Sequence, residues 1–506
     1  MAAPVGALRS PVCYEPASAS MTNPRLTAAP AGTVLTLLDQ ATARVPTRRA
    51  VADEHLTLDY RMLHTRVATA AEQLRTAGIG RGDRVAIVLP NSVAFVEAFL
   101  GVLAAGAAAM PVLASARTSE LRRLFAEARM SGCITSPDDD RTLAPITLTA
   151  GAAGLGLTRS AREGQSPRST TAVTPADVAL IASSSGTMAR PHLVARTHEN
   201  LWWEAENFWS ATQLGSDDVV LGVVPLSHAH GLGNALLAAL RAGASLLLRP
   251  RFLRRQVLDL LAHERVTVFP AVPFMLRMLA ATDRRRRWDL SGLRLCISAG
   301  APLPREVFVA FRNRFGVSTR QLYGLTEAGS VTCDLSAADH VDPATVGRPL
   351  GTVLVSIEDQ SGRTLAPGEI GEIVVRSAAI EGGSARALRT RDLGHCDAGG
   401  TLTITGRTSL FINTAGNKVD PAEVEAALRA HPAVADVAVF GLAAAHDEQV
   451  VAAAIVAASP VSADTLRAHC RERLAPHKVP RVLTFRDALP RSPLGKLLIG
   501  RLLAEA

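Results

Sequence analysis

The stretch at residues 181–187, IASSSGT, carries the strongest signal in this chain of 506 residues. An apolar, strand-like segment ends there in a run of small hydroxyl residues and a glycine. Backbone N–H groups and hydroxyls in such a turn can surround phosphate oxygens, although a Ser-rich turn taken alone is more often a linker. The pattern is not a Walker loop, because no GxxxxGK[ST] occurs here. The residues assigned to this predicted triphosphate cradle are Ser184, Ser185, Gly186, Thr187, Arg190 and His192.

Outward from this stretch, short apolar strands alternate with amphipathic helices. Strand-like segments at 84–89, 219–224 and 293–298 are each followed by a turn and a helical stretch. Such alternation predicts α/β layers with largely parallel strands. Residues 352–405 differ, because strand patterns separated by Gly, Asp and Pro turns predict an antiparallel meander or a small barrel.

The last hundred residues have a mixed pattern. It predicts helices at 421–430 and from residue 463, with strands at 434–441 and 450–456. We therefore expect a large α/β domain at 33–405 and a smaller α+β domain at 406–506. Residues 1–32 are rich in Ala, Pro and Ser, which predicts a disordered tail without a signal peptide and makes Met21 a candidate start.

The composition is that of a soluble globular protein, with 48% apolar and 20% charged residues. The net charge of +8 reflects a bias toward arginine that is scattered along the chain, so we expect no nucleic-acid partner. Six cysteines show no metal-ligand spacing, which fits a reducing cytoplasm. The apolar stretch 93–116 contains Glu97 and Pro111, which favours a buried helix leading into a strand over a membrane span.

Three further stretches carry side chains suited to a nucleotide. In YGLTE at residues 323–327, the ring of Tyr323 can stack on a base, the Thr326 hydroxyl can bond a phosphate, and the Glu327 carboxylate can hold Mg²⁺. The small residues of SAGAP at 298–302 leave room for a flat ring against the backbone. Asp392 fits a ribose diol, and Arg407, fifteen residues later, can bond a ribose or phosphate oxygen.

Only three of the 54 basic residues are lysines: Lys418, Lys478 and Lys496. A chain that uses arginine almost everywhere keeps lysine where a compact ammonium differs from a planar guanidinium. Lys496 lies in PRSPLGK at residues 490–496, where Pro and Gly shape an exposed turn. We interpret it as a catalytic cation delivered by a mobile domain, against the alternative of a residual surface lysine. Lys478 receives no role.

In this order and spacing, the stretches resemble the adenylate-forming superfamily of acyl-CoA and aryl-CoA synthetases, peptide-synthetase adenylation domains and luciferases. The resemblance runs from about residue 33 to the end. It includes GDRVA at 82–86, PLSH at 225–228 and GEIGE at 368–372. It implies a large domain of two α/β subdomains and a small β-barrel-like part that binds ATP and a carboxylic acid. A small mobile lid domain would swing on a hinge near 408–411.

The resemblance also implies a two-step reaction. A carboxylate attacks the α-phosphate of ATP, forming an acyl-adenylate and pyrophosphate, and a phosphopantetheine thiol of CoA or of a carrier protein then takes the acyl group. By resemblance the catalytic residues are Lys496, Thr326, Glu327 and His228, with Mg²⁺ on Glu327. The nucleotide-binding residues beyond the cradle are Gly300, Ala301, Pro302, Tyr323, Asp392 and Arg407. Gly416 and Lys418 would face the thiol in the second pose of the lid.

The chain departs from the family pattern at three places. Ala189 and His192 stand where the phosphate loop usually has Gly and Lys. Histidine is mostly neutral at pH 7, so this loop carries less positive charge, for which Arg190 would compensate in part. We therefore expect weaker binding of ATP or a slower reaction with it. The hinge position, ordinarily Asp or Lys, is Leu410, and the segment at 376–390 is short.

The residues around the predicted acid pocket argue against an α-amino acid, because Pro225 stands where adenylation domains place an Asp for the substrate ammonium. The sequences at 193–198 and 412–419 resemble those of aryl-acid AMP ligases. The sequences at 298–304 and 323–327 resemble those of acyl-CoA synthetases. Ala229 replaces an Asn that aryl-acid ligases use. We expect a small to medium, largely apolar pocket, in which His230 packs. Its lining residues would be His228, Ala229, His230, Gly231, Val272, Pro273, Ser298 and Gly324.

Three functions remain open from the sequence. The leading one is adenylation of a non-amino aryl or short to medium acyl acid, followed by transfer to CoA or a carrier protein. The second is an amide ligase of the same architecture, whose acceptor is an amine. The third is an inactive, ligand-binding member of the superfamily, against which Lys496, Glu327 and Asp392 together argue.

Overall fold

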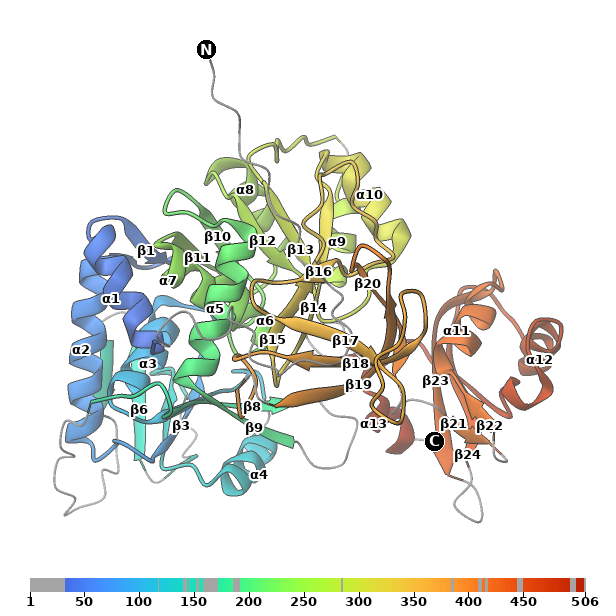
Figure 1. Cartoon of the computed structure of the whole chain (residues 1–506), viewed down its shortest axis with the longest axis horizontal. Helices are drawn as coiled ribbons and strands as arrows, with labels where there is room; N and C mark the ends of the chain where they lie inside the picture. The colour runs from blue at the N-terminus through green and yellow to red at the C-terminus, as the bar shows by residue number, and fades with distance from the viewer. Residues whose placement is uncertain are drawn as a thin grey trace.

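A large α/β part precedes a smaller α+β part in this computed structural model (Figure 1), as predicted. The structure describes residues 32–116, 118–139, 143–144, 146–151, 154–157, 172–184, 192–283, 285–383, 386–407, 412–414, 417–443, 449–491 and 497–504. Apart from Gly32, the predicted tail at 1–32 lies outside them. The predicted domain boundaries stay a prediction.

The first sheet has seven strands in the order β7-β6-β5-β3-β4-β8-β9. Its inner strands pair in parallel, and the edge strands β7 and β9 are antiparallel. The stretch 181–184 of the predicted phosphate cradle ends β8. The strands are β3 (Arg84–Val88), β4 (Ala108–Pro111), β5 (Gly132–Thr135), β6 (Ile146–Gly151), β7 (Gly154–Leu157), β8 (Val178–Ser184) and β9 (His192–Thr197). The helices are α2 (Tyr60–Thr76), α3 (Val93–Ala104), α4 (Thr118–Ala128) and α5 (His198–Thr212).

The second sheet has nine strands in the order β16-β15-β14-β13-β12-β10-β11-β1-β2, with a parallel centre. The strands are β1 (Arg49–Ala52), β2 (Thr57–Asp59), β10 (Val219–Gly222), β11 (Ser245–Leu248), β12 (Val268–Ala271), β13 (Leu295–Ser298), β14 (Thr319–Leu325), β15 (Gly329–Cys333) and β16 (Arg348–Pro349). The helices are α1 (Val34–Arg44), α6 (Ala229–Gly231), the π-helix η1 (Leu232–Leu237), α7 (Ala238–Ala242), α8 (Arg254–His263), α9 (Pro273–Ala280) and α10 (Arg305–Phe315).

The apolar stretch at 93–116 forms a buried helix followed by a strand, as predicted. Helix α3 begins after Ser92, whose hydroxyl accepts a hydrogen bond of 3.1 Å from the Phe95 N–H and caps the helix. Its buried Glu97 pairs with Arg66, which offsets the cost of placing a carboxylate in the core. Among the described helices, none is both long and apolar enough to cross a membrane.

The sequence of residues 352–405 predicted either an antiparallel meander or a small barrel, and the structure shows the meander. The order is β17-β18-β19-β20, and β17 and β20 do not pair with each other in the described residues. A bulge between Glu372 and Val374 kinks the pairing of β18 with β19. The strands are β17 (Leu354–Glu358), β18 (Gly371–Arg376), β19 (Ala387–Cys396) and β20 (Leu402–Arg407).

The C-terminal part has a three-stranded sheet, β23-β24-β25, and a separate hairpin of β21 and β22. Its own core includes Val424, Val439 and Ile455. Lys478, which has no role in the predicted site, forms an ion pair of 2.6 Å with Glu423 on α11. The elements are β21 (Ile412–Thr414), β22 (Asn417–Val419), α11 (Pro421–Arg429), β23 (Val434–Ala443), β24 (Gln449–Ala457), α12 (Ala463–Arg471), the 3₁₀ helix η4 (Pro476–Lys478), β25 (Val482–Phe485) and α13 (Ile499–Ala504).

The buried imidazole of His198 ties the first helix of the chain to α5. Its Nδ1 accepts a hydrogen bond of 3.3 Å from the Val34 N–H, and the residue is 1% exposed. Burial lowers the pKa of His198 to about 4. The unfolded chain, in which histidine titrates near 6.5, therefore binds more protons between these two values.

We expect His198 to lower the free energy of unfolding as the pH is lowered from 7 toward 4. The contribution of His198 is full above about pH 6.5 and is lost progressively toward pH 4, at a cost of about 2 kcal/mol between pH 7 and pH 5. Urea unfolding at pH 7, 6 and 5 measures this loss, and a His198→Asn variant should lose about 2 kcal/mol less than the wild type. Parallel pH profiles for the two proteins would contradict the assignment.

Candidate functional site

Three residues predicted to bind a nucleotide meet in the structure. The Tyr323 hydroxyl donates a hydrogen bond of 2.6 Å to Asp392 Oδ2, and Arg407 Nε lies 3.1 Å from Asp392 Oδ1. Burial and the neighbouring carboxylate raise the pKa of Tyr323, so its hydroxyl remains a donor. Asp392 is 8% exposed, whereas the Arg407 side chain is 42% exposed. The carboxylate is therefore held from two sides at the edge of the protein interior.

The backbone around Asp392 is fixed by the meander. The Thr390 hydroxyl donates to Ile373 O (2.7 Å) and accepts from the Asp392 N–H (3.1 Å). The Arg391 N–H donates to Glu372 Oε1 (3.0 Å), and Arg391 has a φ of 63°. A non-glycine residue adopts this conformation only when its surroundings hold it there.

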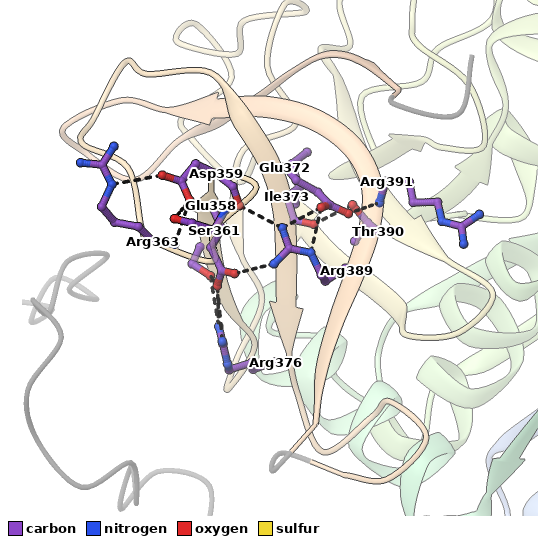
Figure 2. A network of polar contacts seen from close by, with 11 residues as sticks. Glu358, Asp359, Ser361, Arg363, Glu372, Ile373, Arg376, Arg389, Thr390 and Arg391 are labelled. Atoms are coloured by element: carbon purple, nitrogen blue, oxygen red, sulfur yellow. Dashed lines mark hydrogen bonds and ion pairs between the residues drawn. The ribbon is translucent and has the colours of Figure 1, made fainter. Parts of the chain in front are cut away.

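A ladder of charged residues braces this kinked backbone (Figure 2). Arg389 Nε donates to Glu372 Oε2 at 2.9 Å, and its Nη1 donates to Glu358 Oε2 at 2.9 Å. Arg376 approaches the other oxygen of Glu358 at 3.3 Å. Glu358 is 6% exposed, so its charge is balanced by two guanidinium groups. The network joins β17, β18 and β19 close to Asp392, which lies in β19 opposite Arg407 of β20.

The strand that carries Tyr323 continues directly into Thr326 and Glu327. These two residues lie in the turn between β14 and β15, which the Ala328 N–H closes on Leu325 O at 3.2 Å. Gly324 allows this hairpin to close, because a Cβ there would lie 2.6 Å from Gly329 O. Both Thr326 and Glu327 are partly exposed, and within the described part of the chain the Glu327 carboxylate has no hydrogen bond or ion pair. Its oxygens are available to a ligand.

The small residues expected to support a flat ring follow the end of β13. Gly300 has a φ of 85°, and a Cβ there would meet no atom within 4 Å. Ala301 and Pro302 are exposed like Gly300. Ser298 is buried, and its hydroxyl has no hydrogen-bond partner among the described residues.

The predicted acid pocket contains an ordered polar chain centred on His230. Its Nε2 lies 3.0 Å from Ala271 O, and its Nδ1 lies 2.8 Å from Asn234 Nδ2. The Ser330 hydroxyl donates to Asn234 Oδ1 at 2.7 Å. Because a carbonyl only accepts, Nε2 must carry the proton, and Nδ1 accepts from the Asn234 amide. Burial lowers the pKa of His230 to about 4, so the ring is neutral near pH 7.

A narrow cavity joins several predicted pocket residues. His228 and Ala229 line it together with Thr326. Gly231 packs tightly beside it, because a Cβ there would overlap the backbone of Pro225. Val272 and Pro273 follow Ala271, the partner of His230, and begin helix α9. The structure thus brings the start of α6, the end of β12 and the β14–β15 turn to one place.

Other predicted site residues lie outside the described residues: Ser185, Gly186, Thr187, Arg190, Gly416 and Lys496. For Ser184, His192 and Lys418 the structure gives only their positions in β8, β9 and β22.

The structure adds residues to the cavity that the sequence did not indicate. Arg196 and Glu204 both line it, as do Ser227 and Gly233. Arg196 lies inside the fragment 193–198, which we had compared with aryl-acid ligases without assigning a role to that side chain. Glycines at 233 and 329 leave room for Glu204, because a Cβ at either position would overlap its carboxylate.

Comparison with known proteins establishes the family. The family model described as AMP-binding enzyme matches residues 38–383, and the AMP-binding enzyme C-terminal domain matches residues 423–496. The chain therefore belongs to the AMP-binding enzyme family. The prediction of an AMP-forming enzyme that resembles acyl-CoA synthetases is confirmed.

Individual relatives are similar over nearly their whole length. A feruloyl-CoA synthase of Amycolatopsis sp is 34% identical over 481 residues, which cover 90% of this chain and 97% of the relative. The ATP-bound crystal structure of MatB from Rhodopseudomonas palustris has a TM-score of 0.81 at 26% identity, covering 94% of this chain and 99% of MatB. Its apo form has a TM-score of 0.68. An amide bond synthetase, McbA from Marinactinospora thermotolerans, has a TM-score of 0.78 at 27% identity, covering 94% and 100%.

Proposed function

We propose that this chain adenylates a non-amino carboxylic acid with ATP, releases pyrophosphate, and transfers the acyl group to the thiol of CoA. One observation carries the proposal. The Tyr323 hydroxyl and Arg407 hold the Asp392 carboxylate, and Tyr323 lies on β14, the strand that runs on into Thr326 and Glu327 beside the cavity lined by His228. A nucleotide site and an acid pocket therefore share one hairpin.

On the nucleotide side, Asp392 would accept hydrogen bonds from the ribose diol. Each carboxylate oxygen has more than one lone pair, so the contacts to Tyr323 and Arg407 leave acceptor capacity. The exposed, small residues at 300–302 leave a surface for the adenine ring. Ser184, Ser185, Gly186, Thr187, Arg190 and His192 remain the proposed triphosphate cradle.

On the acid side, one carboxylate oxygen of the substrate attacks the α-phosphorus of ATP while the bond to pyrophosphate breaks. The Thr326 hydroxyl and the Lys496 ammonium would stabilise the charge that develops on the phosphate oxygens. The product is a mixed anhydride. A thiolate then attacks its acyl carbon, and AMP leaves with the former carboxylate oxygen.

Mg²⁺ fits the residues at Glu327. No group of three or more His, Cys, Asp or Glu side chains gathers among the described residues, so a cage made only of protein ligands is not available there. Mg²⁺ is commonly bound through one or two carboxylates with substrate phosphates and water, and Glu327 offers such a carboxylate. The ion would neutralise phosphate charge during the attack.

The two-domain arrangement supports a lid. We propose that residues 406–506 close over residues 33–405 for adenylation and reopen for the thiol, with Gly416 and Lys418 on the thiol side. The higher TM-score with ATP-bound MatB, 0.81 against 0.68 for its apo form, supports an adenylation pose. The hinge position, ordinarily Asp or Lys in the family, is Leu410 here.

CoA is favoured as the acceptor because the feruloyl-CoA synthase is similar over 90% of this chain. The similar amide bond synthetase keeps an amine acceptor as the second candidate. A carrier protein is the third. A cytoplasmic location belongs to the same proposal, and it is supported by the buried cysteines Cys296, Cys333 and Cys470, which form no disulfide in the described part of the chain.

Acid-dependent exchange of labelled pyrophosphate into ATP tests the proposal. A panel of aryl and short to medium acyl acids should include at least one that raises the exchange rate more than about tenfold over the acid-free rate. Supplying CoA, a phosphopantetheinylated carrier or amines to the acid that responds then identifies the acceptor. A full-length, folded protein that supports no exchange with any acid would refute the adenylation proposal.

A further inference from the structure

A buried ion pair borders the acid cavity. Arg196, on β9, and Glu204, on α5, have side chains that are 1% and 2% exposed, and Arg196 Nη1 lies 2.5 Å from Glu204 Oε2. Arg196 Nη2 donates to Ala379 O at 2.9 Å and to Asn200 O at 3.3 Å. The guanidinium is thus fixed by the protein, and it holds the carboxylate from one side only.

The Glu204 carboxylate projects between two backbone segments of the site. A Cβ at Gly233 or at Gly329 would overlap it, so both positions leave space for this side chain. Gly233 lies in the π-helix η1, a rare form that is frequent at functional sites. Gly329 follows the turn that carries Thr326 and Glu327. Glu204 therefore lines the same cavity as His228 and Thr326.

Several polar groups that line this cavity have incomplete hydrogen bonding. Within the described part of the chain, only Oε2 of Glu204 accepts a hydrogen bond. Arg196 Nε and the Ser227 hydroxyl are also buried and have no hydrogen-bond partner there. A buried polar group without a partner is costly, so a purely structural ion pair would be expected to use these positions internally. Open acceptor and hydroxyl positions beside a substrate cavity instead fit a ligand that supplies the missing bonds.

We propose that Glu204 selects acids that carry a hydrogen-bond donor, a hydroxyl or an amino group, on the part of the molecule remote from the reacting carboxylate. This inference rests on the proposed adenylation of an acid in this pocket. The donor bonds Glu204 Oε1, while Arg196 holds the carboxylate in position through Oε2. An ether or hydrogen at the same place leaves Glu204 Oε1 without a hydrogen bond, and a second carboxylate on the substrate is repelled.

Matched substrates test the proposal in the wild-type protein. We would measure kcat/KM for pyrophosphate exchange with benzoic and cinnamic acids that carry hydrogen, hydroxyl, amino or methoxy at position 3 or 4. The hydroxyl or amino acid should exceed its methoxy and unsubstituted analogues by at least about tenfold in one matched set. Adenylation of these acids with no preference for a donor in any set overturns the role of Glu204 and leaves the proposed function standing. No exchange with any acid refutes the proposed function itself.

Two variants separate recognition from a structural role. Replacing the pair by apolar residues of similar volume, Arg196→Met with Glu204→Leu, avoids a lone buried charge and should preserve folding. This double variant is expected to lose the donor preference and to favour the methoxy or unsubstituted acid. Glu206→Gln is the matched control, because Glu206 lies on the same helix and pairs with Arg241 at 2.5 Å. Its substrate ratios should stay within twofold of the wild type.

A double variant that folds and keeps the wild-type ratio would show that the pair does not read the substrate. If it does not fold, the wild-type ratios alone decide the proposal.

Discussion

Lys496→Ala is expected to slow adenylate formation by about 10³-fold, while capture of a preformed acyl-adenylate by the thiol stays within about threefold. The ammonium acts while charge is redistributed on the phosphate oxygens, when two anions must approach each other. Once pyrophosphate has left, that charge is no longer developing. The two half-reactions therefore respond differently to the loss of one cation.

The two half-reactions can be measured separately. Pyrophosphate exchange reports the first, and rapid mixing of synthetic acyl-adenylate with CoA reports the second. Lys478→Ala is the matched control, because Lys478 pairs with Glu423 within the C-terminal part at 2.6 Å and should leave both rates within twofold. Equal losses in both half-reactions for Lys496→Ala would contradict the assigned role.

Asp392→Asn is expected to lower kcat/KM for ATP by about 30- to 150-fold, which corresponds to about 2–3 kcal/mol. The substitution keeps the size of the side chain but removes its negative charge. That charge pairs with Arg407, and the carboxylate also accepts a hydrogen bond of 2.6 Å from the Tyr323 hydroxyl. Its effect should fall on ATP, because the acid cavity is lined by other residues. At saturating ATP, the KM for the acid should change by less than threefold.

Asp359→Asn provides the control for damage to the meander. Asp359 lies at the turn after β17, and its side chain accepts hydrogen bonds from Ser361 and Arg363, as Figure 2 shows. Among the interactions of the described residues, its side chain has none with Tyr323, Asp392 or Arg407. Steady-state kinetics with varied ATP should be unchanged within twofold. A similar loss in both variants would mean that Asp392 supports the sheet and does not bind the nucleotide.

Local signals in the sequence were sufficient for most of the fold. The apolar stretch at 93–116 indicated the buried helix α3, and alternating strands and helices indicated parallel sheets. The meander could not be distinguished from a barrel, because closure depends on whether the two edge strands meet. No local pattern contains that information.

Contacts between distant residues account for what the sequence could not show in the site. Tyr323 and Asp392 were each predicted as nucleotide ligands, but their hydrogen bond joins residues 69 positions apart. The place of Glu204 in the cavity was not predicted, because α5 is buried on almost all its faces. Its buried residues include Trp202, Trp203 and Asn207. A polar residue in such a helix has no exposed face to set it apart, so periodicity does not reveal that it reaches a cavity.

The fate of a carboxylate oxygen tests the central claim most directly. The enzyme would be supplied with ATP, CoA and an active acid labelled with ¹⁸O in its carboxylate, and the products analysed by mass spectrometry. Adenylation followed by thiol attack predicts one ¹⁸O atom in AMP and unlabelled pyrophosphate. Label in inorganic phosphate, with ADP as the nucleotide product, would contradict the account.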